Sequence, residues 1–256
     1  MRHQKNNPKS DTSWNKVSGW YDKLVGEFGS DYHQNVIIPN SIKLFNPKKD
    51  ENILDIACGQ GVFSRKLASF GAKVTGIDAS EKLIAIAKEH SKKSHNLSYR
   101  VLDAEHLDGF DPKSFDAASC IMAIQNIDHF GKVINGAGRI LKDKGRILIV
   151  MNHPCFRMPR MSGWGFDEKR KIQYRRIDAY LSEKRVSIDM HPGHDKSIKT
   201  WTFHRPLSSY FRELGKNNFA VTALEEWITH RRTNETADNK SREEIPLFMA
   251  LLAIKQ

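Results

Sequence analysis

Three glycine-rich or acidic motifs follow short apolar runs in the first half of the chain, and their residue types suit the binding of a nucleoside. Gly59-Gln60-Gly61 comes directly after the run 52–57. Glycine permits a tight turn and lets backbone N–H groups approach a ligand closely, because it has no Cβ. Asp78 follows 17 residues after Gly61, where a carboxylate can accept hydrogen bonds from both hydroxyls of a ribose. Asp103-Ala104 follows a third run, where an acid can accept a hydrogen bond from an adenine amino group.

These features leave two alternatives open. NAD enzymes place an acid similarly, but the third glycine of their G-x-G-x-x-G motif falls on Ser64 in this chain. Taken singly, Asp78 and Asp103 could each be a helix cap or a turn residue. Three features at the ends of three successive strands are much harder to explain in that way.

The elements that must position these residues are apolar runs alternating with helical segments. The expected strands are 52–57, 72–77, 97–102, 115–121 and 145–151, and the expected helices are 62–70, 80–90 and 129–141. Two amphipathic helices come before them, and a helix at 206–215 and strands at 219–227 and 246–254 come after the central part. This alternation predicts a doubly wound α/β fold with a mostly parallel, seven-stranded Rossmann-like sheet.

After Met151 the alternation stops for about fifty residues, which is long for a connection within a compact domain. The segment is too aromatic for a linker, and 180–190 and 198–203 could form a hairpin around the turn 191–195. The charged stretch 230–244 is expected to be an exposed loop. We therefore expect four parts: N-terminal helices (1–50), a core (51–152), an inserted substrate lid (153–205) and the remainder of the core sheet (206–256).

In its motifs the chain resembles the class I S-adenosylmethionine-dependent methyltransferases. The resemblance covers roughly 52–152 and rests on Leu54-Asp55-Ile56-Ala57-Cys58-Gly59-Gln60-Gly61, Val74-Thr75-Gly76-Ile77-Asp78, Leu102-Asp103-Ala104-Glu105 and Leu141-Lys142-Asp143-Lys144-Gly145-Arg146. It implies a methyltransferase with S-adenosyl-L-methionine as its cofactor. It also implies cofactor contacts from Asp55, Ala57, Gly59, Gly61, Asp78, Asp103, Ala104 and Ile121, and from Tyr21, because Trp20-Tyr21-Asp22 resembles the Tyr-Asp signature of small-molecule members.

The segment that begins at Asn152 resembles an uncharacterised bacterial branch of the same superfamily, and it starts at the edge of the sheet where α/β folds bind ligands. We expect a small-molecule acceptor there, and arginine favours an anionic one. The predicted acceptor contacts are Trp164, Tyr174, Arg175 and Arg205. His153 is the first candidate for a general base and His204 the second, with a structural, hydrogen-bonded histidine as the alternative for His153.

The same segment matches the Asn-Pro-Pro-aromatic signature of amino-directed methyltransferases poorly. Position 153 is histidine instead of proline, and position 155 is cysteine instead of an aromatic residue. Methylation of adenine or glutamine is therefore not supported.

Composition narrows the choice of partner and compartment. The formal net charge of +11 leaves an RNA methyltransferase open as a second hypothesis, but the lysines are interspersed with acids and no RNA-binding module is visible. A non-catalytic S-adenosylmethionine-binding protein is a third. The three cysteines lack metal or disulfide spacing, so no metal is expected. The chain shows no signal peptide or membrane span, which favours a cytoplasmic location. The acceptor, the methylated atom and the oligomeric state stay open.

We expect that NAD does not bind appreciably, because Ser64 replaces the third glycine and Asp103-Ala104 belongs to a different adenine pocket. A calorimetric titration with NAD, alone and in competition with S-adenosylmethionine, measures this. Micromolar NAD binding that competes with S-adenosylmethionine would contradict the prediction.

Overall fold

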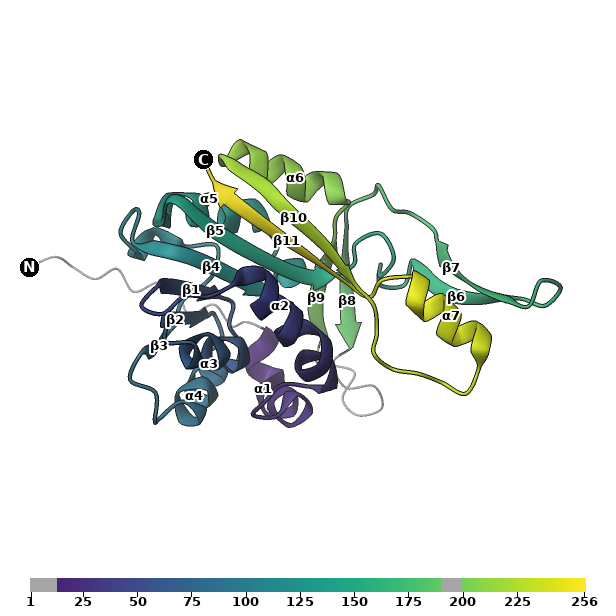
Figure 1. Ribbon diagram of the computed structural model, residues 1–256, viewed down its shortest axis with the longest axis horizontal. Coiled ribbons are helices and arrows are strands. Elements are labelled where there is room, and N and C mark those ends of the chain that lie inside the picture. The colour runs from purple at the N-terminus through teal and green to yellow at the C-terminus, as the bar shows by residue number, and fades with distance from the viewer. Residues whose placement is uncertain (1–12, 190–198) are drawn as a thin grey trace, which may run out of the picture.

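A single seven-stranded sheet forms the centre of the computed structural model, which describes residues 13–189 and 199–256 (Figure 1). The strand order is β10-β11-β5-β4-β1-β2-β3. The strands are β1 (Asn52–Ile56), β2 (Lys73–Asp78), β3 (Leu97–Val101), β4 (Phe115–Ile121), β5 (Leu141–Asn152), β10 (Phe219–Trp227) and β11 (Phe248–Lys255). The first five are parallel to one another, whereas β11 is antiparallel to both β5 and β10. The predicted doubly wound sheet is confirmed.

Helices cover both faces of this sheet. They are α1 (Ser13–Val25), a short π-helix η1 (His33–Ile37) that continues into α2 (Ile38–Phe45), α3 (Val62–Ser69), α4 (Glu81–His90), α5 (Phe130–Ile140) and α6 (Leu207–Lys216). A further helix, α7 (Thr236–Glu244), lies against β7 (Ile172–Ile177), outside the central sheet. Two single 3-10 turns, η2 (Leu107–Gly109) and η3 (Ile124–Asn126), follow β3 and β4. In the part of the chain that the structure describes, none of the helices is long and apolar enough to cross a membrane.

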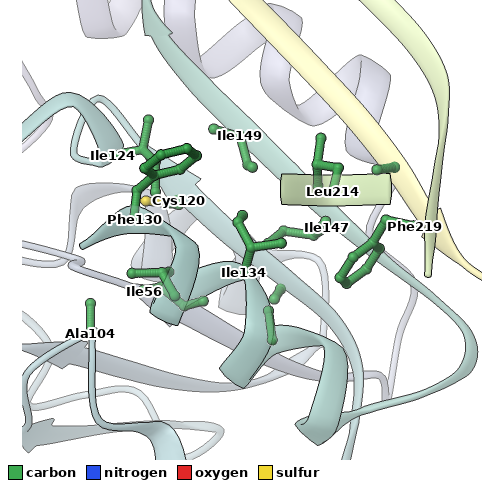
Figure 2. Close-up of a cluster of buried hydrophobic side chains, with 14 of the residues drawn as sticks. Ile56, Ala104, Cys120, Ile124, Phe130, Ile134, Ile147, Ile149, Leu214 and Phe219 are labelled. Carbon is green, nitrogen blue, oxygen red and sulfur yellow. The ribbon is translucent and has the colours of Figure 1, made fainter. Parts of the chain in front are cut away.

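The two faces of the sheet carry separate apolar cores because successive side chains of a strand point to opposite sides. In β5, Ile147 and Ile149 pack with α5 and α6, as Figure 2 shows with Ile134 and Leu214 beside them. Leu148 belongs to the opposite cluster, which α2 and α3 cover. Burial on both faces holds the strands rigidly, so the side chains at their carboxyl ends have fixed positions.

The segment after β5 contains two hairpins. The predicted one is confirmed in its strands, β8 (Lys184–Asp189) and β9 (Lys199–His204), which pair antiparallel; the expected turn at 191–195 lies outside the described residues. A second hairpin, β6 (Ser162–Asp167) with β7 (Ile172–Ile177), was not predicted. It extends to the end of the molecule opposite α3 and α4 (Figure 1).

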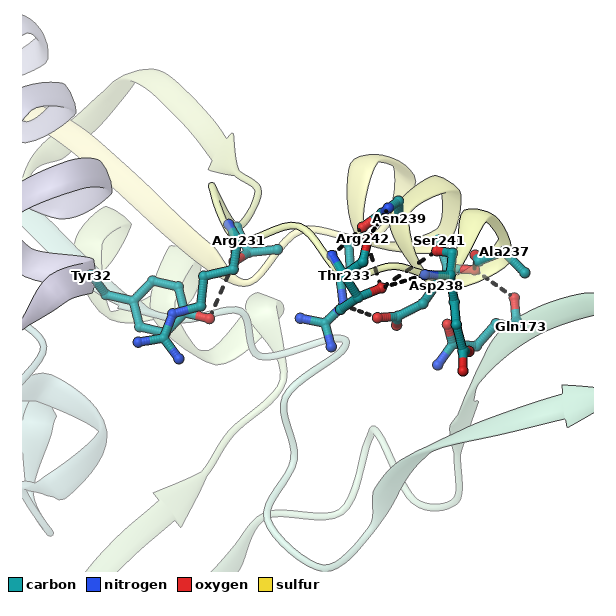
Figure 3. A network of polar contacts seen from close by, with 11 residues as sticks. Tyr32, Gln173, Arg231, Thr233, Ala237, Asp238, Asn239, Ser241 and Arg242 are labelled. Atoms are coloured by element: carbon teal, nitrogen blue, oxygen red, sulfur yellow. Dashed lines mark hydrogen bonds and ion pairs between the residues drawn. The ribbon is translucent and has the colours of Figure 1, made fainter.

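The expectation of a loop at 230–244 holds for 230–235 but is wrong for 236–244, which form α7. Polar contacts fix this helix where an apolar face is lacking (Figure 3). The Asn239 side chain exchanges hydrogen bonds with the backbone of Thr233, and Ser241 Oγ donates to the Gln173 carbonyl of β7. The sequence lacks an apolar stripe here, which is why its periodicity did not predict a helix.

Candidate functional site

The glycine-rich turn between β1 and α3 forms one wall of a cavity of about 320 Å³ at the carboxyl ends of the strands. We call it the main cavity. Ala57, Gly59 and Gly61 all have positive φ, at 53°, 57° and 80°. A Cβ on Gly59 would have only the ring of Tyr21 near it, at 3.8 Å, whereas one on Gly61 would lie 2.2 Å from the Tyr99 hydroxyl. Gly59 therefore leaves the cavity side open. Gly61 does not line the cavity and is required by the packing of Tyr99.

Asp78 connects this turn to the end of β2. Its Oδ2 accepts a hydrogen bond from the Gly59 N–H at 3.0 Å, and its Oδ1 accepts one from the Ser80 N–H at 2.8 Å. Burial raises the pKa of Asp78, and the two N–H donors oppose that rise. Each carboxylate oxygen can accept more than one hydrogen bond, so a ribose facing Asp78 finds acceptors that are already oriented.

Asp55 lies beneath the turn and is 1% exposed. It accepts hydrogen bonds from Ser64 Oγ at 2.5 Å and from Ser119 Oγ at 2.7 Å. Burial raises the pKa of Asp55 to about 6 in spite of these two donors. The two serines belong to α3 and β4, so Asp55 links β1 to both of these elements beneath the turn.

The remaining predicted cofactor residues line the main cavity from three other elements. Asp103 and Ala104 follow β3, and Ile121 ends β4. Asp103 Oδ1 accepts a hydrogen bond from the Glu105 N–H at 2.9 Å, which sets the turn. Tyr21 comes from α1, and burial raises its pKa to about 12, with Asp78 and Cys58 adding to the effect. The structure thus brings together every predicted cofactor contact except Gly61.

Two tethers hold α1 and the loop after it over the glycine-rich turn. Ser80 Oγ donates to Asn15 Oδ1 of α1 at 2.8 Å. Beyond the helix, Gln60 Nε2 donates to the Gly26 carbonyl at 3.1 Å. Together they place Tyr21 opposite Gly59 and so enclose one end of the main cavity.

His33, which the sequence did not single out, also lines the main cavity. Its Nδ1 lies 2.8 Å from Ser30 Oγ, so the serine fixes the imidazole ring. Burial lowers the pKa of His33, which favours the neutral ring. A lone histidine at the start of an amphipathic helix gives no signal in the sequence that it faces a ligand.

The β8–β9 hairpin closes the acceptor side of the main cavity. Arg185 pairs with Phe203 in the hairpin register, and Trp201 lies two residues further along β9, so all three share one face. The three residues line the main cavity, and the Arg185 guanidinium lies 3.8 Å from the centroid of the Trp201 ring. A positive charge stacked on an aromatic face suits an acceptor with a π-system or an anionic group.

Neither predicted base lies at the main cavity. His153 is 2% exposed; its Nδ1 accepts the Cys155 N–H at 3.2 Å, so its protonated Nε2 donates to Glu226, 2.6 Å away. His204 Nε2 donates to the Tyr180 carbonyl at 2.7 Å. With both nitrogens of His153 engaged, the arrangement is that of a structural histidine, the alternative that the sequence left open.

The predicted acceptor contacts are also dispersed. Trp164, Tyr174 and Arg175 belong to the β6–β7 hairpin and line neither the main cavity nor the smaller one beside Arg205. Arg175 Nε donates to the Phe156 carbonyl at 2.8 Å, and Tyr174 is 48% exposed. Only Arg205 borders an enclosed space. The sequence shows two aromatic, basic stretches but not which of them folds over the sheet.

Comparison with known protein families identifies the central part of the chain. Residues 54–149 match the family described as "Methyltransferase domain". This part of the chain is a methyltransferase domain. The match contains most of β1, all of β2 to β4, and most of β5, whereas Tyr21, His33 and the β8–β9 hairpin lie outside it.

Known proteins resemble the methyltransferase domain and its surroundings. The Ubiquinone biosynthesis O-methyltransferase of Hydrogenovibrio crunogenus is 29% identical over 56% of this chain and 60% of its own. The Demethylmenaquinone methyltransferase of Tropheryma whipplei is 30% identical over 59% of this chain and 63% of its own. The chain thus spans under two thirds of the length of these curated relatives. The crystal structure of an S-adenosylmethionine dependent methyltransferase from Mesorhizobium loti is similar in fold, with a TM-score of 0.69, 24% identity, and 84% and 96% of the two chains covered.

The predicted class I methyltransferase fold is therefore confirmed, and residues 54–149 match the methyltransferase family. The use of S-adenosylmethionine and the residue contacts stay predictions. Among the described residues no group of three or more His, Cys, Asp or Glu side chains could hold a metal ion.

We expect Asp78→Ala to weaken the binding of S-adenosylmethionine by at least tenfold. A hydrogen bond to a charged group contributes about 1.5–3 kcal/mol, and the substitution also removes the acceptor that holds the Gly59 N–H. Calorimetry measures the affinity, and thermal unfolding checks that the variant is folded. Asp111→Ala, at an exposed aspartate outside the main cavity, is the matched control. Unchanged affinity in a folded Asp78→Ala protein would remove Asp78 from the site.

Proposed function

We propose that this chain transfers a methyl group from S-adenosylmethionine to a small-molecule acceptor bound in the main cavity. One observation carries the proposal. The same enclosed space is bordered by the strand ends of the methyltransferase domain on one side and by Arg185, Trp201 and Phe203 on the other. Its volume of about 320 Å³ lies within the range of small-molecule sites, roughly 300–1,000 Å³.

The donor side of the cavity fits an adenosyl group with a methionine tail. Asp103 and Ala104 would face the adenine, Asp78 the ribose, and the open side of Gly59 together with Tyr21 the methionine portion. Bound there, S-adenosylmethionine supplies a methyl carbon that is already electrophilic. The protein's task is to hold a nucleophile in line with that carbon and to exclude water.

Proton removal falls to His33 in this proposal, in place of His153 and His204. Its imidazole lines the main cavity, Ser30 fixes the ring through Nδ1, and its lowered pKa keeps it neutral near pH 7. A neutral imidazole can take a proton from a hydroxyl, an ammonium or an acidic carbon of the acceptor.

The acceptor is identified by incubating the protein with a metabolite extract and isotope-labelled S-adenosylmethionine, followed by mass spectrometry of labelled products. A labelled small molecule is the expected result. Cofactor binding without any labelled metabolite would instead support the non-catalytic alternative, and label in RNA would support the RNA methyltransferase.

We expect His33→Ala to lower kcat by about 10²–10⁴, because positioned acid-base groups contribute that much. His95→Ala, at an exposed histidine that borders neither the main cavity nor the one beside Arg205, is the comparison and should retain more of kcat. In the wild type kcat/KM should stay level near pH 7 and fall only well below pH 6.5, because the base works in its neutral form and its pKa is lowered. A His33→Ala enzyme with normal kcat would contradict the role.

The two hairpins of the inserted segment should differ in their effect on the acceptor. We expect Trp201→Ala to raise KM for the acceptor or lower kcat while leaving cofactor affinity nearly unchanged, because its ring lines the main cavity. Tyr174→Ala, which removes an exposed ring from the β6–β7 hairpin, should leave both constants unchanged. The reverse outcome would place the acceptor at the β6–β7 hairpin, as the sequence first suggested.

A further inference from the structure

A smaller cavity of about 200 Å³ lies on the other side of β9. We call it the rear cavity. Thr200, Thr202 and His204 border it, whereas Trp201 faces the main cavity, as the alternation of a strand requires. Trp14, Asn126 and Phe203 line both spaces, so the two cavities adjoin. The rear cavity is therefore an additional space beside the main cavity, and none of the predicted cofactor-binding residues borders it.

Arg205 presents a buried guanidinium at the rear cavity. The residue is only 5% exposed. Its Nη2 donates to the carbonyl oxygens of Ile127 and Asp128, at 2.9 and 2.5 Å, but its Nη1 has no hydrogen-bond acceptor in the described part of the chain. The Tyr210 hydroxyl borders the same cavity, and both the charge of Arg205 and a side-chain hydrogen bond from it act to lower the pKa of Tyr210, against the larger rise that burial causes. Backbone carbonyls and a neutral hydroxyl thus surround this cation, and no carboxylate of the described residues borders the rear cavity to neutralise it.

Arg157 supplies a second cation to the same space. It comes from the segment after β5, and its Nε has no acceptor among the residues described. Its charged neighbours are Arg175 and Arg242, which repel it, and burial together with Arg175 lowers its pKa to about 10. The Trp164 ring, 5.6 Å from its guanidinium carbon, covers it without neutralising it.

No carboxylate is among the described residues that line the rear cavity. A buried charge is costly unless it is paired, and a buried N–H without an acceptor adds to that cost. Two guanidinium groups at one enclosed space therefore favour an anion between them, since arginine matches carboxylate and phosphate oxygens geometrically.

We propose that the rear cavity binds the carboxylate or phosphate group of the methyl acceptor, held by the free nitrogens of Arg157 and Arg205. This inference rests on the proposed function and narrows its substrate class. The acceptor is a small acid with its anionic group behind β9 and its nucleophile in the main cavity, past Trp14, Asn126 and Phe203. The Gln125 carbonyl oxygen Oε1, also without a donor among the described residues, can accept an N–H or O–H from the body of the same molecule.

The test is a calorimetric titration of the full chain, saturated with S-adenosylhomocysteine, with inorganic phosphate and separately with benzoate at constant ionic strength. The two titrations distinguish phosphate from carboxylate, because the probe that binds with higher affinity identifies the anionic group that the acceptor carries. Arg157→Gln and Arg205→Gln should each weaken the preferred anion at least tenfold. Arg176→Gln, at an exposed arginine that pairs with Asp178 on the β6–β7 side, is the charge-matched control and should bind as the wild type does.

Arg205 also holds two backbone carbonyls, so its variant can lose stability; Arg157→Gln, which breaks no hydrogen bond of the described chain, keeps the test decisive. Normal S-adenosylhomocysteine binding with no anion binding would overturn the inference and leave the proposed function intact. Equal loss in Arg176→Gln would also overturn it, because the anions would then be sensing surface charge. Failure to bind S-adenosylhomocysteine would instead overturn the proposed function.

Discussion

The two hydrogen bonds that the Asp78 carboxylate accepts fix the relation between the glycine-rich turn and the end of β2. They hold the turn against the neighbouring strand. Ser80, whose backbone N–H is one of the two donors, also donates a hydrogen bond from its side chain to Asn15 of α1. The glycine-rich wall of the cavity, the Asp78 carboxylate and α1 are thus connected through hydrogen bonds at the end of β2. A substitution there disturbs three segments that are far apart in the sequence.

The residues that the sequence predicted as cofactor contacts, Gly61 excepted, line one cavity, whereas the predicted acceptor contacts are dispersed. Asp78, Asp103 and Ile121 end successive parallel strands, and chain order alone brings such ends to one edge of the sheet. Trp201 faces the cavity only because of the register of the β8–β9 hairpin, and His33 only because of how η1 packs; neither follows from local patterns. The helix α7 was missed since side-chain hydrogen bonds hold it, without an apolar stripe to show in the sequence.

The residues that match the methyltransferase family supply only part of the lining of the two cavities. The family match ends at residue 149, just before β5 ends. It includes Gln125 and Asn126 of the rear cavity, whereas Arg157 and the β9 residues of both cavities lie beyond it. In β9, Trp201 faces the main cavity, Thr200 and Thr202 face the rear cavity, and Phe203 lines both.

Trp14 and Tyr21 lie on the same helix and contact each other edge to face, with ring centroids 5.5 Å apart. Tyr21 encloses the donor end of the main cavity, while Trp14 stands where the two cavities adjoin. The same helix therefore borders both cavities. Under the proposed function, the donor and the acceptor would share α1 as a common wall, so a change in its position would alter the enclosure of both.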